Sequence, residues 1–359
     1  MHTSTGLTAI RYLKSLANGR GDGAAALGFA QSQREWGVDK EFVVTRLKAA
    51  VGGLELSSIE GGSQVGHDLM AALRPLTIVG RLQNLRRVPP RTPLLTQVTG
   101  STASWVGQGQ GRRLSVGTYE RGEIELLTVA ALSVATDELL RDGSMEGETE
   151  LLRDLLAACV EALDRAFIDA ANTGSAGITP ASVTSSATPI VSGGGTIAYL
   201  DADLATAVRQ LVAAGSNLSM AAWVMSDVMA AGMGLARGTG GGPAYPGLGA
   251  LGGTLAGLPV LTSSAVPADS DGEQIALVDA SQVTFAEAQP NLRVSRDTAI
   301  EMSTTPTGDS TVPTAATTLV SMFQADSAAL MAQLAVNWQL RRDGCTQVIT
   351  GVPSTLDAS

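Results

Sequence analysis

One continuous stretch of this 359-residue chain, residues 91–173, constrains the fold more than any other. Its first part, residues 92–136, has strand-forming residues on both sides of a centre rich in glycine and serine, residues 100–117. This pattern predicts a hairpin ribbon of about 45 residues, far longer than ordinary hairpin loops. Such a ribbon cannot pack entirely on its own body, so we expect it to reach a neighbouring molecule.

The second part of the stretch predicts a long amphipathic helix over residues 144–172. Its apolar residues recur at spacings of four and three, which places them on one face of a helix. They are Leu152, Leu156, Cys159, Leu163, Ala166 and Ala170. A long polar ribbon therefore runs directly into a helix that has one buried face.

Three successive segments of this stretch carry a family resemblance. They are Ala103-Ser104-Trp105-Val106-Gly107-Gln108-Gly109, then Leu114-Ser115, then residues 130–140. The series resembles the extended E-loop and the following segment of tailed-bacteriophage major capsid proteins, which have the Hong Kong ninety-seven fold. With the C-terminal quarter, the resemblance extends over most of the chain from about residue 61. It implies an α+β fold with an N-terminal arm, an E-loop, a spine helix, a P-domain sheet and an A-domain.

The resemblance also implies a domain layout. We expect residues 1–60 to form the N-terminal arm, 61–91 the start of the P-domain, 92–136 the E-loop and its strands, 137–174 the spine helix, 175–274 the A-domain, 275–335 the P-domain sheet with a hairpin loop at 304–315, and 336–359 the return to the A-domain and the C-terminus. The arm is open to three interpretations: a retained arm, a reduced scaffold or a linker from a longer precursor.

Periodicity and capping residues predict the individual elements. Helices are expected over residues 4–17, 24–34, 39–50, 199–216 and 227–237, and strands over residues 77–79, 223–226, 275–278 and 283–287. The last two strands are expected in one P-domain sheet.

Charge is distributed unevenly along the chain. The net charge is -10, yet residues 1–91 contain twelve Lys and Arg against seven Asp and Glu, so the remainder carries -15. A basic arm on an acidic body is explained equally by subunit docking and by a solvated helix surface. An acidic body argues against tight binding of nucleic-acid phosphates. The resemblance implies that the protein encloses double-stranded DNA, and such a body should contact that DNA only weakly and nonspecifically.

The sequence contains little material for catalysis, and we expect neither enzymatic activity nor a cofactor or metal. Only His2 and His67 are present, and the neighbouring side chains of His67 and Asp68 point apart on a helix or turn. The glycine-rich run 238–242 lacks the Gly-Lys-Ser ending of a phosphate loop. Glu146, Glu148 and Glu150 are explained by a helix dipole. A hydrolase or phosphate-binding enzyme remains the remote alternative.

The ribbon is predicted to supply the contacts between subunits. Trp105 on a polar ribbon has no partner within its own segment, which favours an anchor on a neighbour. The other expected contact residues are Gln108, Arg112 and Arg113, and the acidic groups Glu146, Glu148 and Asp154 on a neighbour. Some relatives crosslink an E-loop lysine to an asparagine, but no lysine follows Lys48 here. The ribbon must therefore hold by burial and charge.

The resemblance implies a shell built from pentamers and hexamers of this chain. Gly240, Gly241, Gly242 and Tyr245 are expected to form a loop at the capsomer axis. Further expected partners are a portal and a scaffold, protease or decoration protein, with assembly in the bacterial cytoplasm and final location in the virion. An encapsulin-like cargo compartment is the nearest alternative. The uncharged runs 170–200 and 238–268 are rich in Gly, Pro, Ser and Thr, which predicts loops and strands rather than membrane spans.

Overall fold

The computed structural model describes residues 3–19, 22–33, 36–51, 69–99, 103–106, 108, 111–112, 114–141, 145–269, 272–301 and 319–356. The chain divides into two compact units. Unit 1 comprises Met1–Pro75, Val129–Cys159 and Gln289–Leu334, and unit 2 comprises Leu76–Thr128, Val160–Ala288 and Ala335–Ser359. Within the described part of the chain, no helix combines the length and the hydropathy that crossing a membrane requires.

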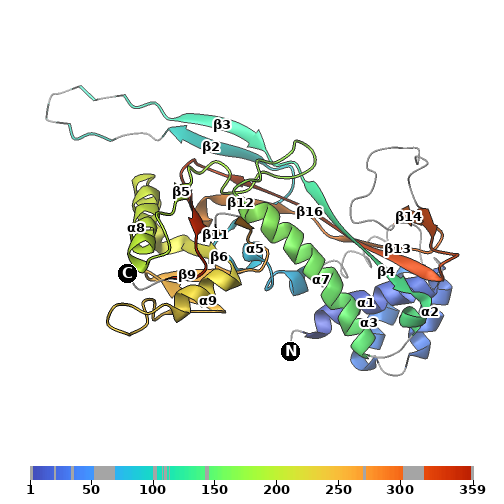
Figure 1. Cartoon of the computed structure of the whole chain (residues 1–359). Coiled ribbons are helices and arrows are strands. Elements are labelled where there is room, and N and C mark those ends of the chain that lie inside the picture. Colours follow the sequence, from blue (N-terminus) through green and yellow to red (C-terminus); the bar gives the residue numbers. More distant parts are fainter. Residues whose placement is uncertain are drawn as a thin grey trace. The chain divides into compact units, whose positions relative to one another are not determined.

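Unit 2 is built on an eight-stranded mixed sheet (Figure 1). Its strand order is β5 (Ile190–Val191), β17 (Thr346–Val352), β11 (Gly272–Asp279), β6 (Ala221–Met225), β9 (Leu258–Thr262), β8 (Gly252–Leu255) and β7 (Leu248–Gly249), with β10 (Ala268–Asp269) on β11. Strand β11 is antiparallel to both β17 and β6, whereas β9 is parallel to β6. The five residues of β6 are all buried, so both faces of the sheet are covered.

One face of this sheet packs against two helices, α8 (Ile197–Ala213) and α9 (Asp227–Leu235). The core positions of α8 recur every three or four residues, as an amphipathic helix requires: Leu200, Leu204, Ala207 and Leu211. They share a core with Trp223 and Met225 of β6. Helix α9 begins where the Ser226 hydroxyl accepts a hydrogen bond from the Met229 amide at 3.0 Å, an N-cap that ends the strand. The strand and helix predicted here are confirmed.

The long helix α7 (Met145–Ile168) confirms the predicted spine helix but ends four residues early. The last carbonyl, of Ile168, accepts hydrogen bonds from the Gln274 side-chain amide at 2.6 Å and from the Thr184 hydroxyl at 2.8 Å. The last carbonyl groups of a helix have no hydrogen-bond partner within the helix, and these two side chains supply partners for the carbonyl of Ile168. Nearby, Phe167 packs edge to face on Trp338, with ring centroids 5.3 Å apart. The C-terminal part of α7 is thereby fixed on unit 2.

A second sheet of unit 2 pairs β1 (Arg86–Val88), β12 (Val283–Glu287) and the second half of β16 (Ser327–Leu340). The expectation that residues 275–278 and 283–287 share one sheet is wrong, because β11 belongs to the eight-stranded sheet. A short 3-10 helix, η2 (Ala280–Gln282), separates the two strands. The Asp279 carboxylate caps it by accepting hydrogen bonds from the amide and hydroxyl of Ser281. This turn redirects the chain from one sheet into the other.

The predicted strand at residues 77–79 is also wrong, since these residues begin the short helix α5 (Ile78–Arg81). The Thr77 hydroxyl accepts a hydrogen bond from the Gly80 amide at 3.1 Å, and the Asp164 carboxylate accepts one from the Ile78 amide at 2.8 Å. Two capping groups at one N-terminus outweigh the strand propensity of isoleucine and valine.

Buried Asp164 links three elements of unit 2 and makes its stability depend on pH. Besides Ile78, its carboxylate accepts a hydrogen bond from Ser263, at 2.7 Å. Burial raises the pKa of Asp164 from 3.8 to about 6, although the hydrogen bonds from Ser263 and Ile78 and the charge of Arg81 lower it in part. Between about pH 4 and pH 6 the folded chain therefore holds a proton that the unfolded chain has lost.

We expect the free energy of unfolding to fall as pH rises through this window, by up to about 3 kcal/mol. Asp164→Asn keeps the shape of the side chain and one acceptor oxygen for the Ile78 amide, replaces the other oxygen by an NH2 group that can donate to the Ser263 hydroxyl, and removes the titration. Urea unfolding of the unassembled chain at pH 4, 5, 6 and 7 measures the difference. A variant with the same pH slope as the unaltered chain would show that Asp164 is not the group responsible.

Unit 1 combines the N-terminal helices with short strands. Helices α1 (Thr3–Asn18), α2 (Gly23–Ser32) and α3 (Gly37–Val51) contact one another, and α1 also contacts β13 (Asn291–Ser295) and α6 (Asp137–Arg141). The three predicted arm helices are confirmed. A polar network holds them, in which the guanidinium of Arg11 pairs with Asp39 at 2.6 Å and lies over the ring of Trp36.

The remaining strands of unit 1 are short. Strand β13 pairs antiparallel with the first half of β16, and β14 (Ala299–Glu301) pairs with β15 (Leu319–Ser321). After leaving unit 1 at Pro75, the chain returns to it along β4 (Leu127–Thr136). The predicted hairpin loop at residues 304–315 lies outside the described residues.

Candidate intersubunit contact sites

The ribbon in unit 2 is a two-stranded antiparallel hairpin, as predicted, but it is shorter than the predicted range 92–136, because β4 pairs with β16 and not within the ribbon. Strand β2 (Pro93–Thr99) pairs with β3 (Thr118–Glu123), from Pro93 opposite Glu123 to Thr99 opposite Thr118. Figure 1 shows the two strands side by side with the loop at their far end. The base is fixed at the buried residues Leu94 and Ile124, which share a cluster with Ala286. The Asn337 amide donates to the Glu125 carbonyl at 2.5 Å. The base of the ribbon is thus anchored on unit 2.

The loop at the end of the ribbon carries apolar side chains that its own unit does not cover. Trp105 is fully exposed, Leu114 is 90% exposed and Val116 is 72% exposed. Gln108 and Arg112 are also exposed, whereas Arg113 lies outside the described residues. An exposed tryptophan leaves a large apolar area in water, which burial against a partner removes.

The predicted acidic partners lie on or near the first turns of the spine helix. Glu146 and Glu148 are in α7, and their side chains are outside the described residues. Asp154 is exposed and accepts a hydrogen bond from the Ser133 hydroxyl at 3.2 Å. Pairing of these groups with Arg112 and Arg113 would join two copies of the chain and stays a prediction.

The predicted axis loop has a defined turn geometry. An isolated bridge between Arg237 and Pro243 closes it, and the Gly238 amide donates to the Gly242 carbonyl at 2.9 Å. Gly240, Gly241 and Gly242 are exposed, and Gly241 has φ +77°, a conformation that glycine adopts without strain. Their place at a capsomer axis stays a prediction.

Tyr245 does not belong with these exposed glycines, although it was expected to. It is buried in the core beneath α8 and α9, and its hydroxyl donates to the Asp201 carboxylate at 2.8 Å. Burial and the neighbouring Asp201 charge raise the pKa of Tyr245. Its aromatic ring fills the core because the glycine-rich loop has already turned back toward the sheet.

Tyr245→Phe tests this internal role. We expect the free energy of unfolding to fall by about 1 kcal/mol, because one hydrogen bond to a partly exposed carboxylate is lost while the ring remains. Particle formation should be unchanged. Urea unfolding and electron microscopy of the variant measure the two quantities. Loss of particles with unchanged stability would instead place Tyr245 at an interface.

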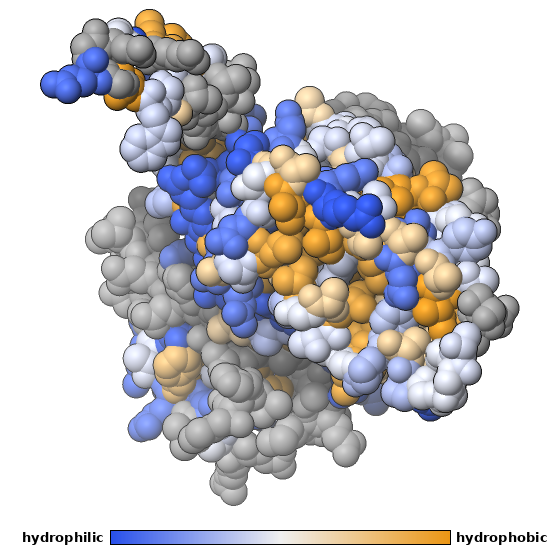
Figure 2. All heavy atoms as spheres, turned by 90° about the vertical axis from the view of Figure 1, so that its left-hand side faces the viewer, coloured by the Kyte–Doolittle hydropathy of each residue, from blue (hydrophilic) through white to orange (hydrophobic). Residues whose placement is uncertain are grey.

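A further set of exposed apolar residues lies on the side of unit 2 that carries α8 and α9. Figure 2 shows apolar residues gathered on this side of the molecule. Those of α8, α9 and the β7–β8 turn are Tyr199, Val212, Val228, Leu235 and Leu251. Leu251 is 98% exposed. The sequence analysis did not predict this exposed apolar face. The local signal for it was Leu251, an apolar residue directly before the turn glycines Gly252 and Gly253.

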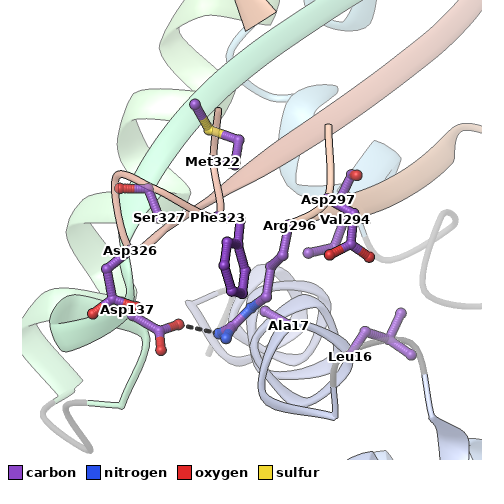
Figure 3. Close-up of a pocket in the computed structure, with 11 residues that line it drawn as sticks. Leu16, Ala17, Asp137, Val294, Arg296, Asp297, Met322, Phe323, Asp326 and Ser327 are labelled. Carbon is purple, nitrogen blue, oxygen red and sulfur yellow. Dashed lines mark ion pairs between the residues drawn. The ribbon is translucent and has the colours of Figure 1, made fainter. Parts of the chain in front are cut away.

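Unit 1 contains a pocket that sequence reasoning also missed (Figure 3). Its volume is about 400 Å³, and four segments line it: the end of α1, the first residue of α6, the end of β13 with the turn after it, and the segment from Met322 to Ser327. Inside it, Arg296 forms an ion pair with Asp137. These two residues are far apart in sequence, so no local pattern indicates their pairing. Among the residues that the structure describes, no cluster of His, Cys, Asp and Glu is arranged to hold a metal ion.

Comparison with known proteins identifies a family and a relative. The phage capsid family matches residues 71–339. The chain is 35% identical, over 97% of its length, to the capsid polyprotein of Pseudomonas phage PAJU2. It spans only 54% of that polyprotein, about half.

Solved structures show the same fold. Those of Mycobacterium phage Bobi and Gordonia phage Cozz match with TM-scores of 0.57 and 0.54, each over 79% of this chain and over 91% and 87% of theirs. The capsid of a native GTA particle matches with a TM-score of 0.51 over 75% of this chain and 89% of its own. Identity is 16% for the two phage chains and 18% for the GTA capsid, so these likenesses concern the fold. The family match covers most of the sequence, and the chain therefore belongs to the phage capsid family, with the Hong Kong ninety-seven fold.

Proposed function

We propose that this chain is the major capsid protein of a tailed double-stranded DNA phage and assembles as pentamers and hexamers into an icosahedral head shell. The observation that carries the proposal is the anchored ribbon with an uncovered Trp105 at its end. An exposed tryptophan at the end of an anchored ribbon is expected in a structural protein whose ribbon contacts a neighbouring copy. Membership of the phage capsid family supports the same role.

Symmetric burial would supply the energy of assembly. Obligate interfaces bury on the order of 2,000 to 5,000 Å². At about 25 cal/mol per Å² of apolar area the gross gain is tens of kcal/mol, and the ordering of ribbon and side chains offsets much of it. The exposed apolar residues on α8, α9 and the β7–β8 turn offer such area around a capsomer axis. Once a shell closes, the loss of one subunit requires several contacts to break together.

The ribbon holds its neighbour without a lysine crosslink in this proposal. Lys48 is the last lysine in the sequence, whereas the ribbon has Arg112 and Arg113. Arginine pairs with carboxylates through two parallel hydrogen bonds, which suits a noncovalent clamp. Glu146, Glu148 and Asp154 of a neighbour are the partners that we propose for these arginines.

The further partners follow from the same role. A portal completes the shell, and a scaffold, protease or decoration protein acts on it during assembly in the host cytoplasm. The net charge of -10 favours weak contact with enclosed DNA, because like charges repel and few cations are available to pair with phosphates. Retention of DNA by emptied shells should accordingly be low at all salt concentrations.

Electron microscopy of the purified chain tests the proposal. We expect closed particles of uniform diameter that sediment far ahead of a 36.7 kDa monomer. A chain that remains a folded monomer or dimer at every concentration and salt tested would overturn the proposal.

A further inference from the structure

The pocket of unit 1 has the size and the lining of a site for a protruding side chain. Its volume of about 400 Å³ falls within the range of ligand pockets. Leu16 and Ala17 of α1 and Met322 provide apolar walls. Figure 3 shows Phe323 beside Arg296 inside this ring of residues. Phe323 is 79% exposed although it lines a cavity, so its ring is available to an incoming group.

The charges of the pocket are mainly negative. Asp137, Asp297 and Asp326 line it together with one cation, Arg296. The ion pair between Arg296 and Asp137 is largely shielded, with side-chain exposures of 14% and 4%. Asp297 and Asp326 remain exposed at the pocket. The surface that surrounds the cavity therefore favours a partner that is apolar at its centre and positively charged beside it.

The end of the ribbon has this composition. Trp105 is a fully exposed aromatic residue, and Leu114 adds a second apolar side chain that is 90% exposed. Arg112 and Arg113 follow Trp105 in the sequence and carry two positive charges, and residues 100–117 contain no acidic residue. The pocket and the ribbon end thus complement each other in charge, and each presents an uncovered aromatic ring.

We propose that the pocket receives the ribbon end of a second copy of this chain, with the indole of Trp105 against Phe323 and Met322. Arg112 then faces Asp297 and Asp326 at the edge, and Arg113 is left to pair with the carboxylates of Glu146, Glu148 and Asp154 named above. An offset or edge-to-face pair of rings and a tryptophan in an enclosed pocket are typical of the residues that dominate binding at an interface. The inference rests on the proposed function, because it names the surface that the ribbon contacts in the shell.

Crosslinking between engineered cysteines tests this contact without removing either aromatic ring. Ser104→Cys places a thiol beside Trp105, and Thr298→Cys places one beside Asp297; both positions are exposed. The two native cysteines, Cys159 and Cys345, are buried. Assembled particles of the double variant are treated with a short bis-maleimide and separated on denaturing gels. The matched control combines Ser104→Cys with Ile178→Cys, an exposed position of unit 2 outside α8, α9 and the β7–β8 turn.

We expect a ladder of covalent dimers and larger species from Ser104→Cys with Thr298→Cys, and monomers from the control. Particles that give no ladder would overturn the pocket assignment and leave the shell function standing. An internal crosslink within one chain would overturn the assignment to a second copy. Absence of particles from the unaltered chain would remove the proposed function itself. If only the cysteine variant fails to assemble, Val106→Cys with Thr298→Cys gives the same readout.

A charge rescue provides an independent measurement. Arg112→Glu with Arg113→Glu should reduce assembly, and the addition of Asp297→Arg should restore at least part of it, since opposite charges again face each other. No gain in particle yield from Asp297→Arg in this background would contradict the contact.

Discussion

Trp105→Ala leaves the chain folded and prevents closed shells: this is the largest effect that we expect from a single substitution. Trp105 is fully exposed in the single chain, so its removal should change the free energy of unfolding by less than about 0.5 kcal/mol. At an interface a buried tryptophan is worth about 2 to 4 kcal/mol, or roughly 30- to 1,000-fold in the affinity of each contact. Because every subunit repeats the contact, the loss recurs throughout the shell.

Particle yield as a function of protein concentration measures this effect. We expect Trp105→Ala to stay unassembled at concentrations where the unaltered chain forms particles. Trp105→Phe is the matched control, since it keeps an aromatic ring and should retain assembly with a modestly higher threshold. Equal yields from the alanine variant and the unaltered chain would show that the ribbon end does not anchor the shell.

Reversal of both ribbon arginines is the second substitution with a large expected effect. Arg112→Glu with Arg113→Glu turns attraction toward a neighbour's carboxylates into repulsion, and we expect it to block particle formation while the subunit stays folded. We expect this repulsion whichever acidic groups of the neighbour the arginines contact, because the chain carries ten more negative than positive charges. Circular dichroism and sedimentation measure folding and assembly in the same sample.

Two controls separate charge from disruption of the ribbon. Arg112→Lys with Arg113→Lys keeps the charge but loses the planar fork, so it should assemble more weakly than the unaltered chain and more strongly than the reversal. Lys48→Glu reverses an exposed charge outside the ribbon and should assemble normally. Normal shells from the double reversal at physiological salt, where charge is only partly screened, would contradict a charged clamp.

The elements that the sequence predicted correctly are those whose signals are local. The arm helices, the ribbon and the strand before α9 rest on periodicity and on caps such as Ser226, which act within a few residues. The spine helix was predicted too long because its end is fixed by Gln274 and Thr184, which meet it only in the folded unit. The strand predicted at Ile78 is a helix because its cap, Asp164, lies 86 residues away.

The candidate sites also separate into those with a local signal in the sequence and those formed only by the fold. Trp105 and its neighbours were found because an aromatic residue in a polar segment is visible in the sequence, and the structure leaves Trp105 uncovered. Tyr245 was placed with the glycine loop by proximity in the sequence, whereas its side chain turns into the core. The pocket around Arg296 and Asp137 was missed because it is assembled from four separate segments of unit 1. Neighbouring residues in the sequence can be assigned to one loop, but the direction of each side chain and its distant contacts are known only from the fold.

The central claim is that this chain is a shell subunit held to its neighbours by the ribbon. Electron microscopy of the unaltered chain and Trp105→Ala, purified and concentrated side by side, tests it most directly. We expect uniform closed particles from the first and folded, unassembled subunits from the second. Closed particles from both would contradict the role of the ribbon, and particles from neither would contradict the claim that the chain forms a shell.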